Sequence, residues 1–249
     1  MKFILLSVNC LMVIPAYCES RRLPSYLKEL VAELLHSPVE VTIRVVDDGS
    51  SQSEKEALRL LIAECSKCYP RLEVCFQEPN QGKGAAIRRG WKASPGFDWL
   101  GFLDADGSVP VSEVLRLLSI LNEESPNLIG SRILLMGKTI QRRASRHLMG
   151  RLYMAIVSLL FPIQIYDSQC GYKLIRSRDY FAMESELREN GFCFDVELLL
   201  FLYQRGILVR EVPISWNHIP GSKVRLWWDP FKMLIALIRL RLRFSFSKK

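Results

Sequence analysis

Three groups of polar residues in this chain have the types and spacing that metal-assisted phosphate chemistry uses. The first is Asp104-Ala105-Asp106, in which two carboxylates stand two positions apart. Both can reach one hard cation if the backbone turns between them, and Mg²⁺ or Mn²⁺ held in this way completes its coordination with substrate phosphates. Alone, the triplet is as compatible with a solvated turn, because Asp and Gly107 favour turns.

Two further groups add to this signal. Asp47-Asp48-Gly49-Ser50 carries carboxylates that can accept hydrogen bonds from a ribose or a base N–H. Asn80-Gln81-Gly82-Lys83-Gly84 opens a predicted helix, where exposed backbone N–H groups and a lysine suit a phosphate. The spacing of a Walker A loop is absent. Each group alone is also typical of an ordinary turn or a capped loop.

The elements that must position these groups alternate between strand and helix patterns. Strands are predicted over residues 11–17, 40–46, 72–77 and 99–103, and helices over 23–36, 57–65, 83–92 and 111–121. This alternation is typical of a parallel sheet with helices on both faces, in which ligands bind beyond the carboxyl ends of the strands. Glu19, Asp48 and Asp104 all follow such ends, so we expect one binding site.

The second half of the chain is less regular. A basic segment spans 141–151 and an apolar one 153–165, a strand is predicted over 168–176, a helix over 193–204 and a strand over 208–216. The apolar stretch 231–246 carries interspersed cations, and its alternation over 239–246 leaves helix and strand open. Because no linker divides the chain, we expect one domain over 1–226 and a basic amphipathic extension over 227–249.

Composition excludes several classes of protein. With 249 residues, 49% of them hydrophobic and 24% charged, the chain can bury a large core and is not a disordered protein. The net charge of +8 favours anionic partners, but no nucleic-acid motif is present. Seven cysteines are too few for a disulfide scaffold, and the lone pair Cys65 and Cys68 is a weak zinc signal. Neither 3–18 nor 152–166 is long enough to predict a membrane span, and no signal-peptide cleavage site follows the first stretch.

Six motifs follow one another along the chain: Val13–Glu19, Val45–Ser50, Asn80–Gly84, Asp104–Gly107, Gly130–Arg132 and Asp167–Lys173. Their order resembles that of the inverting family 2 glycosyltransferases that act on polyprenyl phosphates. Three more are similar to the dolichyl-phosphate β-glucosyltransferase branch rather than the mannosyl branch: Phe194–Leu198, Glu211–Trp216 and Gly221–Lys223. The resemblance extends from about Leu11 to Phe244.

This resemblance implies a fold and an activity. The fold would be α/β: a single GT-A, Rossmann-like nucleotide-diphospho-sugar transferase domain with a mostly parallel sheet and C-terminal membrane-interface helices. The activity would be metal-dependent transfer of glucose from UDP-glucose, with inversion, to a polyprenyl or dolichyl phosphate. Mannosyl transfer from GDP-mannose to the same lipids, or transfer to a different acceptor, stays open.

The resemblance also assigns roles to residues of this sequence. The donor nucleotide sugar would contact Pro15, Tyr17, Glu19, Val46, Asp47, Asp48, Lys83 and Ala105. The acceptor phosphate would contact Arg142, Arg143, Arg146, Gln169 and Lys173. The catalytic residues would be Asp104, Asp106, Arg132 and Asp195, of which the first two would hold Mg²⁺ or Mn²⁺.

The chemistry of a phosphate acceptor limits what these residues must do. A phosphate monoester is largely ionised at pH 7, so no strong general base is required. We therefore expect Asp195 to orient the acceptor rather than to take a proton, and Glu197, two positions away, to face elsewhere on its helix. Arginines match phosphate geometry, so Arg132→Ala is expected to remove activity without unfolding the chain.

Two departures from the family pattern bear on the site and on the membrane. Cys18 stands where the family usually has Asn. The eukaryotic glucosyltransferase has an N-terminal membrane anchor, whereas this chain begins at the predicted first strand, so we expect attachment through 148–166 and 227–249. The expected location is cytoplasmic, peripheral on the cytosolic face of a membrane, with a nucleotide-sugar donor, a lipid phosphate and no nucleic acid as partners.

Proteins from other classes fit the sequence less well. A processive polysaccharide synthase would share the fold, but its Q-x-x-R-W motif and several membrane spans are not found. A catalytically inactive relative would be expected to lose a carboxylate of the triplet, and both Asp104 and Asp106 are present.

Overall fold

The computed structural model describes residues 8–92, 94, 96–133, 137–140, 144–221 and 228–244, with the side chains of 144–148 outside the description. Its strands are β1 (Asn9–Ala16), β2 (Glu40–Asp48), β3 (Leu72–Gln77), β4 (Trp99–Leu103), β5 (Asn127–Ser131), β6 (Tyr172–Arg176) and β7 (Val209–Pro213). Its helices are α1 (Leu23–Leu34), α2 (Gln52–Cys65), α3 (Lys83–Trp91), α4 (Val111–Leu118), α5 (Ala144–Leu160), α6 (Ser177–Phe181), α7 (Phe194–Gln204) and α8 (Trp228–Arg243), with a 3-10 turn at Glu184–Glu186.

The strands form one mixed sheet in the order β3-β2-β1-β4-β6-β5-β7. Strands β1 to β4 run parallel to one another, β5 and β7 are parallel to each other, and β6 is antiparallel to both β4 and β5. Ala16 pairs with Asp47, so the loop after β1 and the carboxylates at the end of β2 meet at one edge. Asp104 follows β4 at the same edge, as the sequence predicts.

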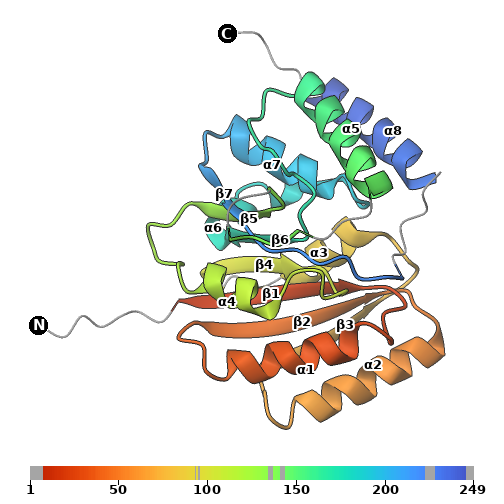
Figure 1. The fold of residues 1–249 in the computed structure, drawn as a ribbon, viewed down its shortest axis with the longest axis vertical. Coiled ribbons are helices and arrows are strands. Elements are labelled where there is room, and N and C mark those ends of the chain that lie inside the picture. Colours follow the sequence, from red (N-terminus) through yellow and green to blue (C-terminus); the bar gives the residue numbers. More distant parts are fainter. Residues whose placement is uncertain are drawn as a thin grey trace, which may run out of the picture.

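Helices cover both faces of the sheet (Figure 1). Helices α1, α2 and α4 bury their apolar sides on one face. On the other face α3, α6 and α7 pack against the sheet, and α5 and α8 lie side by side beyond them. Helix α8 packs through Ala236, Leu237 and Leu240, which are buried in this second core.

Local sequence explains where the helices near the site begin. Ser51 caps α2 by accepting a hydrogen bond from the Glu54 N–H, and Pro110 precedes α4. Helix α3 begins after Gly82, whose φ of 104° is in the region that favours glycine. A Cβ at Gly82 would lie 2.6 Å from the Asn190 carbonyl oxygen, so glycine also allows the close approach of the two segments.

Two sequence expectations differ from the structure, and one alternative left open by the sequence is decided. Strand β5 was not predicted, because its five residues NLIGS contain few strong strand formers. The predicted strand over 168–176 begins only at Tyr172, since Ser168 to Gly171 turn into it. The alternating segment 239–246 is helical as far as Arg243, because its period of two is overridden by packing of Leu237 and Leu240. Among the described residues, no helix combines the length and apolar sequence needed to cross a bilayer.

Candidate active site

The two carboxylates of the Asp104-Ala105-Asp106 triplet stand at the carboxyl edge of the sheet. The Asp104 N–H donates to the Gly171 carbonyl oxygen at 2.9 Å, and Asp106 Oδ1 accepts from the Ser108 N–H at 3.0 Å. Their side chains are 38% and 25% exposed, whereas Ala105 between them is buried. A Cβ at Gly171 would lie 1.9 Å from Asp104 Oδ2, so only glycine leaves room for this carboxylate.

Lysine 83 connects the triplet to helix α7. Its Nζ lies 2.7 Å from Asp104 Oδ1 and 3.7 Å from Asp195 Oδ2. Burial alone would lower the pKa of the Lys83 ammonium, but Asp104 and Asp195 raise it above its ordinary value. Burial would raise the pKa of the Asp104 carboxyl, and Lys83 lowers it below its ordinary value instead. The two side chains therefore form a charged pair at neutral pH.

Asp195 and Glu197 use opposite sides of α7, as expected from their spacing. Asp195 Oδ1 accepts from Lys173, which also donates to the Cys170 carbonyl oxygen at 2.8 Å. Glu197 accepts from the backbone N–H groups of Arg188 and Glu189 and from Arg243. Asp195 is 1% exposed and engaged by two lysines. This environment suits a residue that positions cations better than one that accepts a substrate proton.

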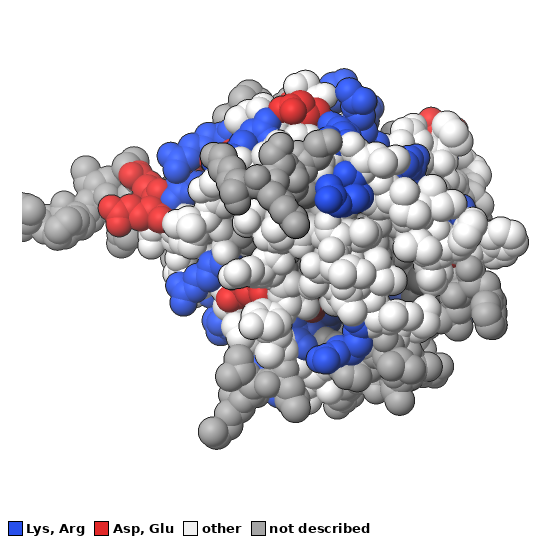
Figure 2. Space-filling model, turned by 90° about the horizontal axis from the view of Figure 1, so that it is seen from above, with Lys and Arg blue, Asp and Glu red and all other residues white. Residues whose placement is uncertain are grey.

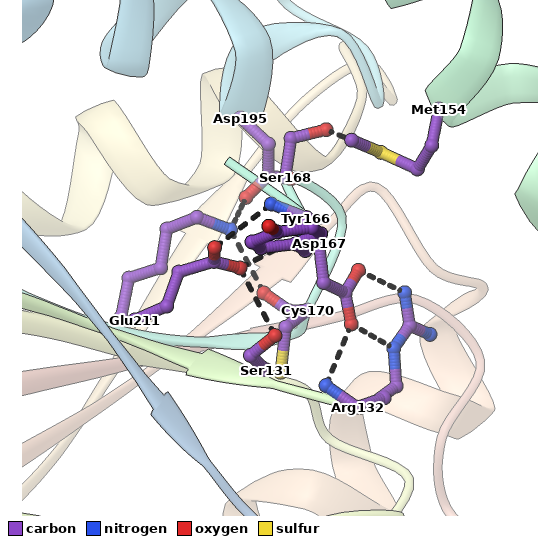
Figure 3. A network of polar contacts seen from close by, with 10 residues as sticks. Ser131, Arg132, Met154, Tyr166, Asp167, Ser168, Cys170, Asp195 and Glu211 are labelled. Carbon is purple, nitrogen blue, oxygen red and sulfur yellow. Dashed lines mark hydrogen bonds and ion pairs between the residues drawn. The ribbon is translucent and has the colours of Figure 1, made fainter. Parts of the chain in front are cut away.

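Arg132 is fixed by a carboxylate that sequence reasoning did not assign to the site (Figure 3). Its Nε and Nη2 each lie 2.7 Å from an oxygen of Asp167, and its backbone N–H donates to Asp167 Oδ2 at 2.9 Å. Burial would raise the pKa of the Asp167 carboxyl, but Arg132 outweighs it and lowers that pKa to about 2. Arg132 is thereby held close to Lys173 and Asp104, whose charges also affect the Arg132–Asp167 pair.

Glu211 in turn holds Asp167, and it too was missed. It accepts hydrogen bonds from the Tyr166 N–H at 2.8 Å, the Asp167 N–H at 2.9 Å and Ser131 Oγ at 3.0 Å. Figure 3 shows Glu211, Asp167 and Arg132 in one network. The motifs that contain Asp167 and Glu211 were recognised in the sequence, but the positions that pair are separated by tens of residues, so spacing alone did not reveal these contacts.

The residues predicted for the donor pocket surround the same edge. Asp48 accepts from Gln77 Nε2 at 2.6 Å and from the N–H groups of Gln81 and Gly82 at 2.8 and 2.7 Å. Because Gly82 precedes Lys83, this carboxylate ties the end of β2 to the lysine that faces Asp104. Asp47 accepts from the Ser50 N–H at 3.0 Å. The separate acidic segments of the prediction therefore lie in one connected region.

The loop after β1 lies beside the end of β2 and beside the triplet. Glu19 forms a two-point pair with Arg22, and Arg22 Nη1 lies 3.7 Å from Asp106 Oδ2. Tyr17 is exposed, and Pro15 at the end of β1 is partly buried. Cys18 has a φ of 52°, and its N–H donates to Ser50 Oγ at 2.8 Å, which joins this loop to the end of β2.

Some predicted site residues are placed away from bulk solvent or outside the described residues. Val46 is fully buried in the core, so its side chain is not available to a ligand. Lys173 is also fully buried, so its ammonium meets Asp195 rather than the surface. Gln169 Nε2 donates to the Phe192 carbonyl oxygen at 3.2 Å. Arg142 and Arg143 lie outside the described residues; Arg146 belongs to α5, but its side chain is not described.

The donor set fits a divalent cation that shares its coordination with a substrate. Among the described residues, no three His, Cys, Asp or Glu side chains gather into a complete metal cage. Asp104 and Asp106 instead offer two partly exposed carboxylates. Burial would lower the pKa of Arg22; Glu19 is the main cause that raises it, and Asp106 and Asp104 add to this effect, so both carboxylates of the triplet lie near one guanidinium. Mg²⁺ or Mn²⁺ bound by two carboxylates leaves positions for phosphate oxygens.

Comparison with known proteins agrees with this geometry. The family model described as "Glycosyl transferase family 2" matches residues 12–183. A human protein named dolichyl-phosphate beta-glucosyltransferase is 33% identical over 246 residues, covering 93% of this chain and 74% of the relative. The Saccharomyces cerevisiae protein of the same name is 30% identical over 249 residues, covering 93% and 74%.

Solved structures show the same fold at low sequence identity. Glucosyl-3-phosphoglycerate synthase from Mycobacterium tuberculosis in complex with UDP superposes with a TM-score of 0.66 at 17% identity, covering 96% of this chain and 82% of that one. Its complex with Mn²⁺, UDP and glucosyl-3-phosphoglycerate gives a TM-score of 0.63 at 16% identity, with the same coverage. The expected GT-A-like architecture is confirmed.

Proposed function

The chain belongs to glycosyl transferase family 2 and is a glycosyltransferase, and from this premise we propose that it transfers glucose from UDP-glucose to dolichyl phosphate with inversion. The names of the relatives support the sugar and the lipid. The observation that carries the proposal is the convergence of Asp104 and Asp106 with Lys83 and Arg132 at one edge of the sheet. Carboxylates for a cation and cations for phosphates are what a nucleotide-sugar donor and a phosphate acceptor require.

Asp104 and Asp106 would hold Mg²⁺ or Mn²⁺ in this proposal. When bound, the cation neutralises the charge that develops on the departing nucleoside diphosphate. The chain's own residues orient the rest of the donor. In this proposal Asp47 and Asp48, which are buried at the end of β2, accept from the ribose or base of the bound donor, and Tyr17 and Glu19 of the neighbouring loop contact the same nucleotide.

The acceptor side needs cations rather than a base. The phosphate of dolichyl phosphate is already largely ionised at pH 7, so its oxygen can attack without proton removal by the protein. Arg132 is aligned for a phosphate by Asp167 and Glu211. Asp195 acts by placing Lys83 and Lys173, which agrees with its burial and its two ion pairs.

A surface on α5 and α8 suits attachment to a membrane, where a dolichyl acceptor would lie. The exposed apolar residues of these helices are Met149, Leu152, Leu159, Trp228, Phe231, Leu234, Ile235, Ile238 and Leu242. Arg151, Lys232 and Arg239 are exposed on the same helices. Figure 2 shows that this side of the molecule carries scattered basic and few acidic residues. Cationic helices with aromatic and apolar faces lie in bilayer interfaces, so we propose peripheral attachment on the cytosolic face.

The direct test measures transfer of label into a lipid phase. Purified protein is incubated with dolichyl phosphate, Mg²⁺ or Mn²⁺, and radiolabelled UDP-glucose, GDP-mannose or other nucleotide sugars, with a chelator in a parallel series. We expect label from UDP-glucose alone in the organic phase, and its loss with chelator and in Asp104→Asn or Asp106→Asn. Glu56→Gln, at an exposed position of α2, is the matched control. Preferential transfer from GDP-mannose, or none from any donor, would contradict the proposal.

A further inference from the structure

Lys83 is the first residue of α3, and the chain around it is fixed. The Ala85 N–H donates to the Asn190 carbonyl oxygen at 3.0 Å. Gly84 lies so close to Phe194 that an added Cβ would be 2.4 Å from the Phe194 Cβ. The backbone beside Lys83 is therefore held against Asn190 and the start of α7, and the flexible side chain reaches from there to Asp104.

The Lys83 ammonium has two acceptors within reach at different distances. Asp104 Oδ1 is in hydrogen-bond contact at 2.7 Å, and Asp195 Oδ2 is 3.7 Å away. The ammonium also lies 5.1 Å from the centre of the Phe102 ring, a favourable position for a cation. A shift of roughly 1 Å toward Asp195 would exchange one carboxylate for the other while keeping the ring contact.

Asp195 is positioned to pair with the Lys83 ammonium after this shift. Its Oδ1 is already bonded to Lys173, which is fully buried and is held by the Cys170 carbonyl oxygen. That contact fixes the carboxylate and leaves Oδ2 directed at Lys83. Asp104, by contrast, is more exposed and is the carboxylate assigned to the divalent cation.

We infer that Lys83 is a built-in competitor for the divalent cation: it neutralises Asp104 in the substrate-free enzyme and moves toward Asp195 and the donor diphosphate when cation and nucleotide bind together. This inference rests on the proposed function, because it takes Asp104 as a cation ligand. It assigns Lys83 a positioning role beyond phosphate binding. As a result, the affinity of the site for the cation is low until the diphosphate of the donor binds the Lys83 ammonium.

The inference predicts opposite effects of one substitution on two binding reactions. Without nucleotide, Lys83→Gln removes the competing ammonium, so Mn²⁺ should bind roughly tenfold more tightly, as loss of one charge-assisted contact implies. With UDP present, the same variant lacks a cation for the diphosphate, so Mn²⁺ should bind roughly tenfold more weakly. A lysine that only bound phosphate would leave the first reaction unchanged, and a purely structural lysine would weaken both.

Titration of free Mn²⁺ by electron paramagnetic resonance measures both reactions without relying on turnover. The proteins are wild type, Lys83→Gln, the charge-preserving Lys83→Arg, and Lys138→Gln, which removes the comparable 2.6 Å pair with Glu113 outside the site. Circular dichroism and thermal unfolding establish that each variant is folded. We expect the reversal only in Lys83→Gln, with Lys138→Gln indistinguishable from wild type and Lys83→Arg closer to wild type than to Lys83→Gln.

Each outcome bears on the inference. The reversal supports it, whereas Mn²⁺ affinity that is unchanged or weakened in nucleotide-free Lys83→Gln overturns it and leaves the proposed transferase standing. If wild type binds no Mn²⁺ even with UDP, the cation site of the proposed function fails as well. If Lys83→Gln does not fold, Lys83→Arg in the same titration provides the test. Its guanidinium keeps a positive charge beside Asp104, so nucleotide-free Mn²⁺ binding must stay weak. Tighter Mn²⁺ binding in Lys83→Arg would overturn the inference.

Discussion

Arg132 and Asp167 form a two-point ion pair, in which Nε and Nη2 of the guanidinium meet different oxygens of one carboxylate. The two residues are 35 positions apart, and Glu211 on β7 holds the backbone of Asp167. The pair, together with Glu211, therefore connects three parts of the chain: the end of β5, the segment that precedes β6, and strand β7. An arginine fixed in this way presents its charge in one orientation, which is what recognition of a phosphate requires.

Arg132→Ala is expected to lower glucosyl transfer by roughly 100-fold or more, the effect of removing one preorganised charge-stabilising donor. The fold should survive with a loss of about 1–3 kcal/mol, because Asp167 loses its guanidinium partner but keeps the backbone N–H of residue 132. Transfer assays with thermal unfolding separate the two effects. Arg71→Ala, which removes an exposed pair with Glu40, is the control. Near-normal turnover in Arg132→Ala would rule out the assigned role.

The pKa of Asp167 predicts an acid-sensitive part of the stability. Its folded value of about 2 is below the ordinary value of about 3.9, so ionised Asp167 stabilises the fold above about pH 4, and this contribution is lost as the pH falls from about 4 to 2. The contribution is about 2–3 kcal/mol. Urea unfolding of wild type and Asp167→Asn should show a difference in stability that is constant near pH 7 and narrows below pH 4. A difference that stays constant down to pH 2.5 would contradict this.

Most of the fold follows from local sequence, because the strands β1 to β4 are rich in apolar and β-branched residues and each intervening helix has one apolar face. Strand β5 does not, since Asn127 and Gly130 weaken its pattern, and its place is set by β6 and β7 on either side. The antiparallel direction of β6 depends on the path of the chain between β4 and β6, which no local pattern records.

In the site, too, some features follow from local sequence and others depend on contacts between distant segments. The placement of Asp48, Asp104 and Asp106 was predictable because each lies at or just beyond the end of a strand, at an edge that parallel strands share. Asp167 and Glu211 were not, because their roles depend on contacts between β5, β7 and the segment before β6. The family resemblance predicts that Lys173 contacts the acceptor phosphate, but its pairing with Asp195 in the interior depends on packing against α7.

Membrane attachment can be tested on α8 without removing it. Truncation after Trp228 would take Leu237 and Leu240 out of the core, so loss of binding could reflect unfolding. Phe231→Glu with Ile238→Glu instead changes exposed positions of the proposed surface. We expect severalfold less protein to sediment with vesicles that contain anionic lipid, because apolar area is lost and negative charge is added. Leu60→Glu, exposed on α2 on the opposite face, is the control, and equal sedimentation of all three proteins would exclude this surface.

Cys18 is expected to be a destabilising residue at its position. Its φ of 52° is in the left-handed region, which costs a non-glycine residue about 1 kcal/mol and which Asn tolerates better than Cys. Cys18→Asn should therefore raise the free energy of unfolding by a substantial part of that amount, with the Ser50 contact to the backbone N–H retained. Cys18→Ala keeps the strain and should give no gain, which separates backbone conformation from removal of a thiol. Urea unfolding under reducing conditions measures all three proteins, and a gain in Cys18→Ala equal to that in Cys18→Asn would show that the backbone is not the cause.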